Sequence, residues 1–308
     1  MGAFPRAGGA KGWNGYAVVR EKRMRVRHLL WCQNILGEAP CWDAARGLLY
    51  WVDIVAQRVF RFEPTTGTRR AWSLNLRPSA LALRVDGTLL MAAGASVGVF
   101  DPATGRYEPR VILDEPRGHR TNDGKVGADG HFWFGTMAEH ADDRTGSLYR
   151  LDQNWNCVRV GSGIGIPNTM TTTPGGRALY VAESLDHAIY RHCLEGGALG
   201  SRELFVRTSP PNQPDGAAID REGGLWSAHW AGSQLVRYTP RGEIDGVVKM
   251  PIANPTSCCF GGDDLRTLYV TSARQGVGRK GRLLRPYSGD LFAFDVEIAG
   301  EPVLVFGG

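Results

Sequence analysis

The sequence predicts an all-β protein, a six-bladed β-propeller with four-stranded antiparallel blades. Short apolar strand cores recur along the chain, and the middle residues of successive cores lie about 40 to 47 residues apart, a period typical of propeller blades. The cores are Leu49-Tyr50-Trp51, Leu89-Leu90-Met91, Phe132-Trp133-Phe134, Leu179-Tyr180-Val181, Leu225-Trp226-Ser227 and Leu268-Tyr269-Val270. No long apolar pattern of period 3.6 occurs, so we expect helices to be minor.

Each repeat also contains the turns and strands that a blade needs. Turn pairs precede four of the cores, at residues 86–87, 129–130, 175–176 and 223–224. A further strand follows each core, at residues 59–62, 97–100, 148–151, 188–191, 235–238 and 291–294. A ring of blades limits exposed strand edges. We expect a strand near residues 26–36 to close it by pairing with the last blade, which would end near residues 303–306.

Composition and charge narrow the class of protein. The chain has 308 residues, of which 43% are hydrophobic and 22% charged, which is typical of a globular protein with a large core. The net charge of +5 comes from residues 1–28, which hold seven basic residues and one acidic residue. The rest is nearly neutral, which argues against a nucleic-acid partner. We therefore expect a basic, disordered extension over residues 1–25 and one propeller domain over residues 26–308.

Localisation signals are absent from the sequence. No window approaches 18 uninterrupted apolar residues, and no apolar stretch follows the basic N-terminal residues. The six cysteines show no C-x-x-C pair, as expected for reduced, buried residues rather than a thiolate metal site. These features predict a cytoplasmic protein, monomeric and without a membrane partner.

Four polar residues occupy equivalent positions in four repeats. Glu38, Asn122, Asn168 and Asp215 each lie 11 or 12 residues before the middle of the following strand core. Equivalent positions in a radial array become neighbours around its axis, so the spacing predicts one shared site. Carboxylate and amide oxygens suit Ca²⁺, Mg²⁺ or Mn²⁺, and a less selective site accepts Zn²⁺ or Fe(II).

Taken alone, each of these residues is compatible with a purely structural role. Glu38, Asn168 and Asp215 all lie in Pro- or Gly-rich segments where a turn or capping residue would be ordinary. Asn122, with Asp123 and a glycine after it, fits a tight turn. Their joint occurrence at equivalent positions is what favours a metal site.

At these residues the chain resembles the SMP-30/gluconolactonase/regucalcin-like sugar lactonases over about residues 32–306. The motifs that carry the resemblance are L-G-E-A-P-C-W at 36–42, R-T-N-D-G-K-V at 120–126, F-W-F-G-T-M at 132–137, P-N at 167–168, P-D-G at 214–216 and F-G-G-D-D-L-R-T-L-Y-V-T-S-A at 260–273. Later stretches are most similar to bacterial aldonolactonases that act on pentose or hexose lactones.

The resemblance implies a role for each motif residue. Glu38, Asn168 and Asp215 would bind one divalent metal ion, and Asp215 would also be the general base. Arg120 would bind the substrate, and Asn122 would face the metal, either touching it directly or holding substrate and water. Asp123 would orient its neighbours. Two departures occur: His140 stands where many relatives have a substrate-contacting Glu, and Glu183 stands where many have Asp.

The implied activity is metal-dependent hydrolysis of a pentono- or hexonolactone to the aldonic acid. The metal would polarise the carbonyl, and Asp215 or a metal-bound water would deliver the nucleophile. Two alternatives stay open: another metal-dependent hydrolase, acting on aryl esters or phosphotriesters, and a non-enzymatic, calcium-binding propeller. His140 is also compatible with a solvated loop, His229 with a structural role, and Trp230 with the mouth of the channel.

Overall fold

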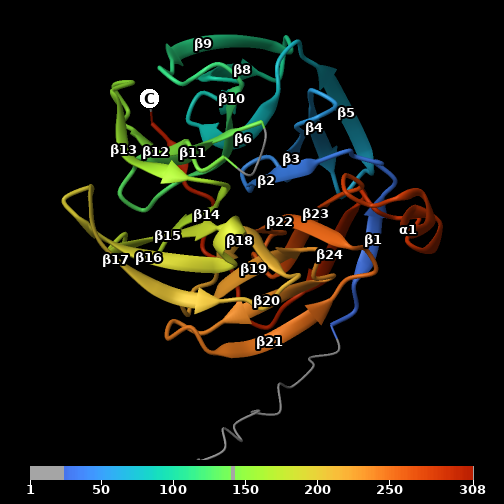
Figure 1. Ribbon diagram of the computed structural model, residues 1–308. Coiled ribbons are helices and arrows are strands. Elements are labelled where there is room, and N and C mark those ends of the chain that lie inside the picture. Colours follow the sequence, from blue (N-terminus) through green and yellow to red (C-terminus); the bar gives the residue numbers. More distant parts are fainter. Residues whose placement is uncertain (1–23, 140–142, 308) are drawn as a thin grey trace, which may run out of the picture.

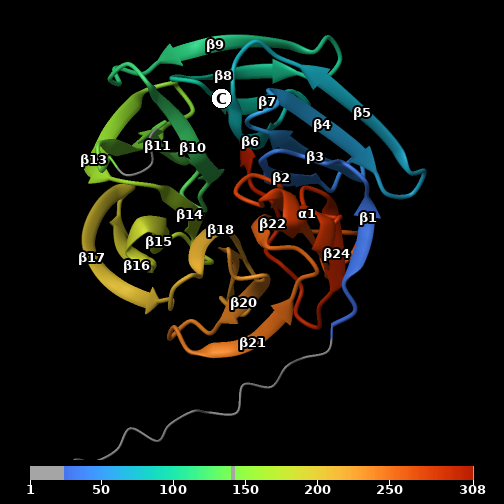
Figure 2. The same ribbon diagram turned by 45° about the vertical axis from the view of Figure 1, so that its right-hand side comes forward.

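Each repeat folds into four antiparallel strands, because alternating apolar residues favour strands and the tight turns between them join neighbouring strands as hairpins. A computed structural model describes residues 24–139 and 143–307, and its sheets stand around a central axis (Figures 1 and 2). This confirms the six-bladed β-propeller. The extension expected over residues 1–25 falls almost wholly outside the described residues.

The blades follow one another in chain order, each running from an inner to an outer strand. Blade one holds β2 (Gly37–Asp43), β3 (Leu48–Asp53), β4 (Arg58–Glu63) and β5 (Thr68–Ser73). Blade two holds β6 (Pro78–Arg84), β7 (Leu89–Ala93), β8 (Ser96–Asp101) and β9 (Arg106–Ile112). Blade three holds β10 (His119–Val126), β11 (Phe132–Ala138), β12 (Gly146–Leu151) and β13 (Cys157–Ile164). Blade four holds β14 (Pro167–Thr172), β15 (Ala178–Glu183), β16 (Ala188–Glu195) and β17 (Ala198–Arg207). Blade five holds β18 (Gln213–Ile219), β19 (Leu225–Trp230), β20 (Gln234–Tyr238) and β21 (Ile244–Lys249). Blade six holds β22 (Asn254–Gly261), β23 (Thr267–Ala273), β24 (Leu291–Asp295) and β1 (Arg27–Leu30).

Burial falls from the axis outward. The inner strands β14 and β22 are buried at every position, whereas the outer strands β5 and β9 are mostly exposed. Aromatic rings fill the space between and within blades: Trp42 of blade one stacks on Tyr269 of blade six at a centroid distance of 5.4 Å. The inner strands are therefore held rigidly where they line the axis.

The two ends of the described chain play different parts in closing the ring. β1 pairs with β24 and completes blade six, as the sequence predicts. The expected end of that blade near residues 303–306 is wrong, because β25 (Val305–Phe306) pairs in parallel with β6 of blade two. The outer place in blade six is already taken by β1. Residues 299–306 instead cross from blade five, where Glu301 donates to the Ile219 carbonyl, to blade two.

Helices are few among the described residues, as expected. The 3₁₀ turn η1 (Ser184–Asp186) follows β15, and the short helix α1 (Arg279–Leu284) lies between β23 and β24 with no buried side chain. The Gly-rich run at 276–281 thus ends inside α1. None of the helices in the described ranges is long and apolar enough to span a membrane.

A bulge recurs in the inner strand of every blade. The pairing of inner strand and second strand shifts register once in each blade, at 38–41, 78–80, 121–124, 168–171, 214–217 and 255–258. A bulge redirects side chains at the point where it interrupts the ladder. All six bulges begin in the first half of their strands, so they form a ring toward one mouth of the channel, called here the upper mouth.

The opposite, lower mouth has a cavity of its own. It is about 800 Å³, counting space open to solvent, and the second halves of the inner strands line it, together with residues 301–304. Lys125 reaches into it from β10 and donates to the Ala217 carbonyl of β18. None of the residues that the structure describes lines both this cavity and the one at the upper mouth.

Candidate active site

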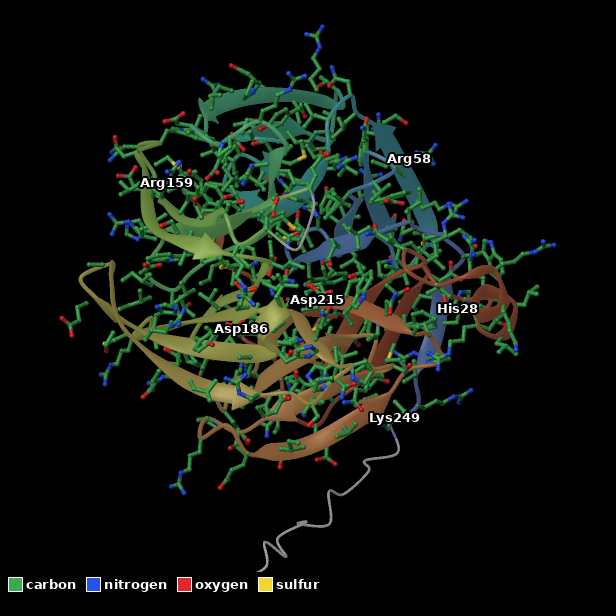
Figure 3. The ribbon with its side chains drawn as sticks, viewed as in Figure 1. His28, Arg58, Arg159, Asp186, Asp215 and Lys249 are labelled. Carbon is green, nitrogen blue, oxygen red and sulfur yellow. The ribbon has the colours of Figure 1, made fainter. Side chains whose placement is uncertain are left out.

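The upper mouth opens into a cavity of about 780 Å³, counting space open to solvent, in which most of the predicted residues meet. Glu38, Asn122, Asn168 and Asp215 all line it, although they come from four different blades. Figure 3 shows Asp215 near the middle of the ring, with Arg58 and Lys249 toward its edge. Four inner strands therefore direct oxygen atoms into one space, as the repeat spacing predicts.

The bulges explain why these side chains face the axis. Glu38 and Asn168 stand directly before a register shift, and each is followed by a non-glycine residue with a left-handed backbone: Ala39 has φ 50° and Thr169 has φ 71°. Such a conformation is costly for a residue with a Cβ atom and is kept only where the surroundings impose it. Asp215 lies inside the bulge of β18. Local backbone strain thus accompanies the orientation of Glu38 and Asn168.

A chain of hydrogen bonds joins blades three, four and five across the mouth. Arg120 donates to the Asn122 side-chain oxygen at 2.8 Å, and Asn122 donates to the Asn168 oxygen at 2.9 Å. Asn168 donates to the Ser184 hydroxyl at 2.9 Å, which donates to the Pro214 carbonyl at 2.6 Å. This order assigns the oxygen and nitrogen ends of both carboxamides. The Asn168 oxygen keeps one lone pair for another partner.

Three carboxyl groups gather at the same place, with Asp123 and Asp215 buried and Glu38 half-buried. Burial raises the pKa of Glu38 well above its ordinary value, and the neighbouring Asp215 and Asp123 raise it further. The pKa of Asp215 is likewise raised well above its ordinary value, first by burial and then by Asp123. The Asp123 pKa is raised by burial and lowered in part by Lys125. The Oδ2 atom of Asp123 is buried without a hydrogen-bond partner in the described chain.

Arg120 is the cation of the upper mouth. Its burial lowers its pKa to about 10, and the nearby Arg77 acts in the same direction. Arg77 itself pairs with Glu139 at 2.8 Å, so that carboxylate is already engaged. Arg120 uses one nitrogen for Asn122 and the Thr121 carbonyl. Its other N–H groups make no hydrogen bond within the described ranges and are available to a ligand that enters the cavity.

The donor set fits one divalent cation. Glu38, Asn168 and Asp215 bring two carboxylates and one amide oxygen, all hard donors, and the mutual repulsion of the carboxylates would be relieved by a dication. Within the described ranges, no group of three or more His, Cys, Asp or Glu side chains is arranged to hold a metal. The candidate set is therefore a mixed one that depends on the amide.

Met137, Ser184 and Gln213 line the cavity although the sequence did not predict them, whereas Trp230 was already considered for the mouth of the channel. Met137, Ser184 and Trp230 each lie four residues after the middle of a strand core, so a second equivalent position supplies part of the wall. Gln213 lies two residues before Asp215, a spacing that places both on one face of a strand. These two periodicities could have revealed them.

The remaining predicted residues fall into two groups. His140 lies outside the described residues, next to Glu139, which does line the cavity. His229 is buried, with hydrogen bonds to Gln234 and Tyr238, in keeping with the structural role expected. Glu183 accepts hydrogen bonds from the Gly165 and Ile166 amides and shapes the turn that leads to Asn168.

The fold and the site together define a class: six-bladed propellers with oxygen donors converging at one mouth of the channel. The chain belongs to the SMP-30/gluconolactonase/LRE-like family, whose model matches residues 36–274. This confirms the resemblance seen in the sequence motifs.

Similar proteins span nearly the whole chain. A 6-deoxy-6-sulfogluconolactonase of Pseudomonas putida is 33% identical, over 89% of this chain and 96% of that one. A pentonolactonase of Haloferax volcanii is 36% identical, over 87% and 93% respectively. A solved structure of regucalcin from Agrobacterium tumefaciens, described as a calcium-binding protein, is 28% identical, with a TM-score of 0.88 over 92% of this chain and 97% of that one.

Proposed function

We propose that this protein is a carboxylic ester hydrolase that opens a pentono- or hexonolactone to its aldonic acid with the help of one divalent metal ion. The observation that carries the proposal is the convergence of Glu38, Asn168 and Asp215 on one cavity beside Arg120 and Asn122. The names of the relatives support the reaction class: a sulfogluconolactonase, a pentonolactonase and an L-arabinolactonase of Azospirillum brasilense.

Glu38, Asn168 and Asp215 would hold the metal. A divalent cation at these oxygens supplies Lewis acidity that polarises the lactone carbonyl. Calcium is compatible with this all-oxygen set, and Mg²⁺, Mn²⁺, Zn²⁺ and Fe(II) are compatible to differing degrees.

The protein's own groups perform the proton chemistry. One oxygen of Asp215 takes the proton of the water that attacks the carbonyl carbon, and the new C–O bond gives a tetrahedral intermediate. The ring C–O bond then breaks, the leaving alkoxide takes the proton that Asp215 had accepted, and the open acid results with Asp215 again ionised. Burial raises the pKa of Asp215, so its carboxylate binds a proton more strongly than an exposed one. With a dication at the site, it would stay ionised and ready to accept the proton of the water.

Arg120 and Asn122 position the substrate. The N–H groups of Arg120 not used inside the protein face a ring oxygen or hydroxyl, and the contact with Asn122 fixes the guanidinium plane. Asp123 follows Asn122 in the chain, and its carboxyl group raises the pKa of Asp215. Lys125 in turn partly lowers the pKa of Asp123.

The direct test is acid release from a panel of sugar 1,4- and 1,5-lactones, run beside an aryl ester and a phosphotriester. We expect turnover of a sugar lactone well above that of the other two. Preference for the aryl ester or phosphotriester contradicts the substrate class. Calcium binding without any turnover contradicts the assignment as an enzyme.

Arg120→Met tests the positioning role. Loss of charged hydrogen bonds to substrate predicts a fall in kcat/KM of about 10- to 100-fold, mainly through KM. Steady-state kinetics on the preferred lactone measure it. Arg58→Met, at the exposed first residue of β4 in blade one, is the matched control (Figure 3). Equal kinetics for both variants would remove Arg120 from the site.

A further inference from the structure

One side of the upper cavity is lined by residues that have no role in the proposed reaction. Trp230, at the end of β19, is the single aromatic residue among those that line the cavity in the described ranges. Gln213 and Gln275 line it too. These three residues come from blades five and six, whereas Arg120 and Asn122 come from blade three.

The indole of Trp230 is held in place from behind. It is only partly buried, and it packs against the buried cluster that contains Leu36 and Ala273. The loop after β23 lies beside it, because a Cβ atom at Gly276 would stand 3.5 Å from Cζ2 of the indole. A ring that is fixed on one side and open to a cavity on the other is a preformed surface for a ligand.

Two side-chain amides flank this ring and have no hydrogen-bond partner among the residues that the structure describes. Gln213 is the cross-strand partner of Trp230 in the β18–β19 ladder. The backbone of Gln275 is fixed, since its N–H donates to the Ile35 carbonyl at 2.9 Å and its carbonyl accepts from Asn254 at 2.8 Å. The side chains of Gln213 and Gln275, and the indole N–H of Trp230, make no hydrogen bond within residues 24–139 and 143–307.

We propose that Trp230, Gln213 and Gln275 form a subsite for the hydroxylated part of the substrate. The apolar C–H face of a sugar ring packs on the indole, and the two carboxamides, which both donate and accept, bind its hydroxyl groups. The inference rests on the proposed lactone hydrolysis. It makes these residues determinants of specificity, because a cavity built to hydrogen-bond hydroxyls disfavours a substrate that lacks them.

The test compares two lactones in the metal-loaded full chain. One is the sugar lactone hydrolysed fastest, and the other is the unsubstituted lactone of the same ring size. We expect Trp230→Leu, Gln213→Leu and Gln275→Leu each to lower the ratio of the two kcat/KM values by about five- to tenfold, mainly by raising KM for the sugar lactone. Trp230→Phe, which keeps an aromatic face, should restore most of the ratio. Trp31→Leu, on an exposed tryptophan at the outer edge of blade six, is the matched control.

A binding measurement separates this inference from the proposed activity. D-glucono-1,5-lactam keeps the ring hydroxyls but has an amide in place of the ester, so its affinity can be measured by calorimetry without turnover. We expect the wild-type chain to bind it and each leucine variant to bind it about five- to tenfold more weakly. A wild-type chain that hydrolyses no lactone but shows this pattern loses the proposed function and keeps the subsite. Unchanged ratios and unchanged lactam affinity in all three variants overturn the subsite. If Trp230→Leu does not fold, the kcat/KM ratios and lactam affinities of Gln213→Leu and Gln275→Leu provide the test.

Discussion

Asp215→Asn is expected to lower kcat for lactone hydrolysis by about a thousandfold, within the range typical of a general base. The change leaves the shape of the side chain almost intact but removes both the proton acceptor and one anionic metal ligand. The fold should survive, because Asp215 lies among buried carboxylates that repel one another and the variant has one charge fewer there. The melting temperature of the chelated variant is therefore expected to equal or exceed that of the chelated wild type.

Steady-state kinetics and thermal unfolding of the same preparation measure both effects. Asp264→Asn, in the exposed turn between β22 and β23 at the lower mouth, is the matched carboxylate-to-amide control. A thousandfold loss together with a large drop in melting temperature would indicate a structural role for Asp215. Activity near that of the wild type would refute its assignment as the base.

Chelation is expected to lower activity by at least about a hundredfold, in line with the several kcal/mol that a Lewis acid contributes. Addition of Ca²⁺, Mg²⁺, Mn²⁺ and Zn²⁺ one at a time should restore activity to differing extents, which ranks the ions. Full activity after exhaustive chelation, verified by elemental analysis, would exclude a catalytic metal.

The same cluster makes stability depend on pH in a predictable direction. The pKa values of Glu38 and Asp215 are raised in the folded chain, so the folded state binds more protons than the unfolded state above the ordinary carboxyl pKa of about 4. The unfolding free energy of the chelated protein should therefore fall as pH rises from about 4 through the raised values. A bound dication favours the ionised carboxylates and offsets that loss.

Thermal unfolding at pH 5 and pH 8, each with chelator or with excess divalent ion, measures this coupling. The gain in melting temperature on adding the ion should be larger at pH 8. A gain that is the same at both values would mean that the ion does not bind at these carboxylates.

The sequence predicts the architecture and the centre of the site because both follow from a repeat. Glu38, Asn168 and Asp215 occupy equivalent positions at the start of inner strands, so counting from the strand cores is enough to bring them together. Side chains from loops or from the ends of second strands lack so strong a signal. Gln275 is the clearest example, since its position depends on the path of a loop held by Ile35 and Asn254.

The closing strands show the same limit. β1 is predictable because an incomplete last blade needs one more strand. The course of residues 299–306 is not, because it depends on which inner strand edge is free to accept a short parallel partner. That choice is settled by tertiary packing, in which Phe306 is buried beside Trp155.

The path of residues 299–306 bears on how the substrate reaches the site and how the product leaves it. They pass beneath the ring from blade five to blade two, and none of the described residues lines both cavities on the axis. We therefore expect the substrate to enter, and the acid to leave, through the upper mouth. Substrate and product would then share one opening, and each turnover would have to clear it before the next could begin.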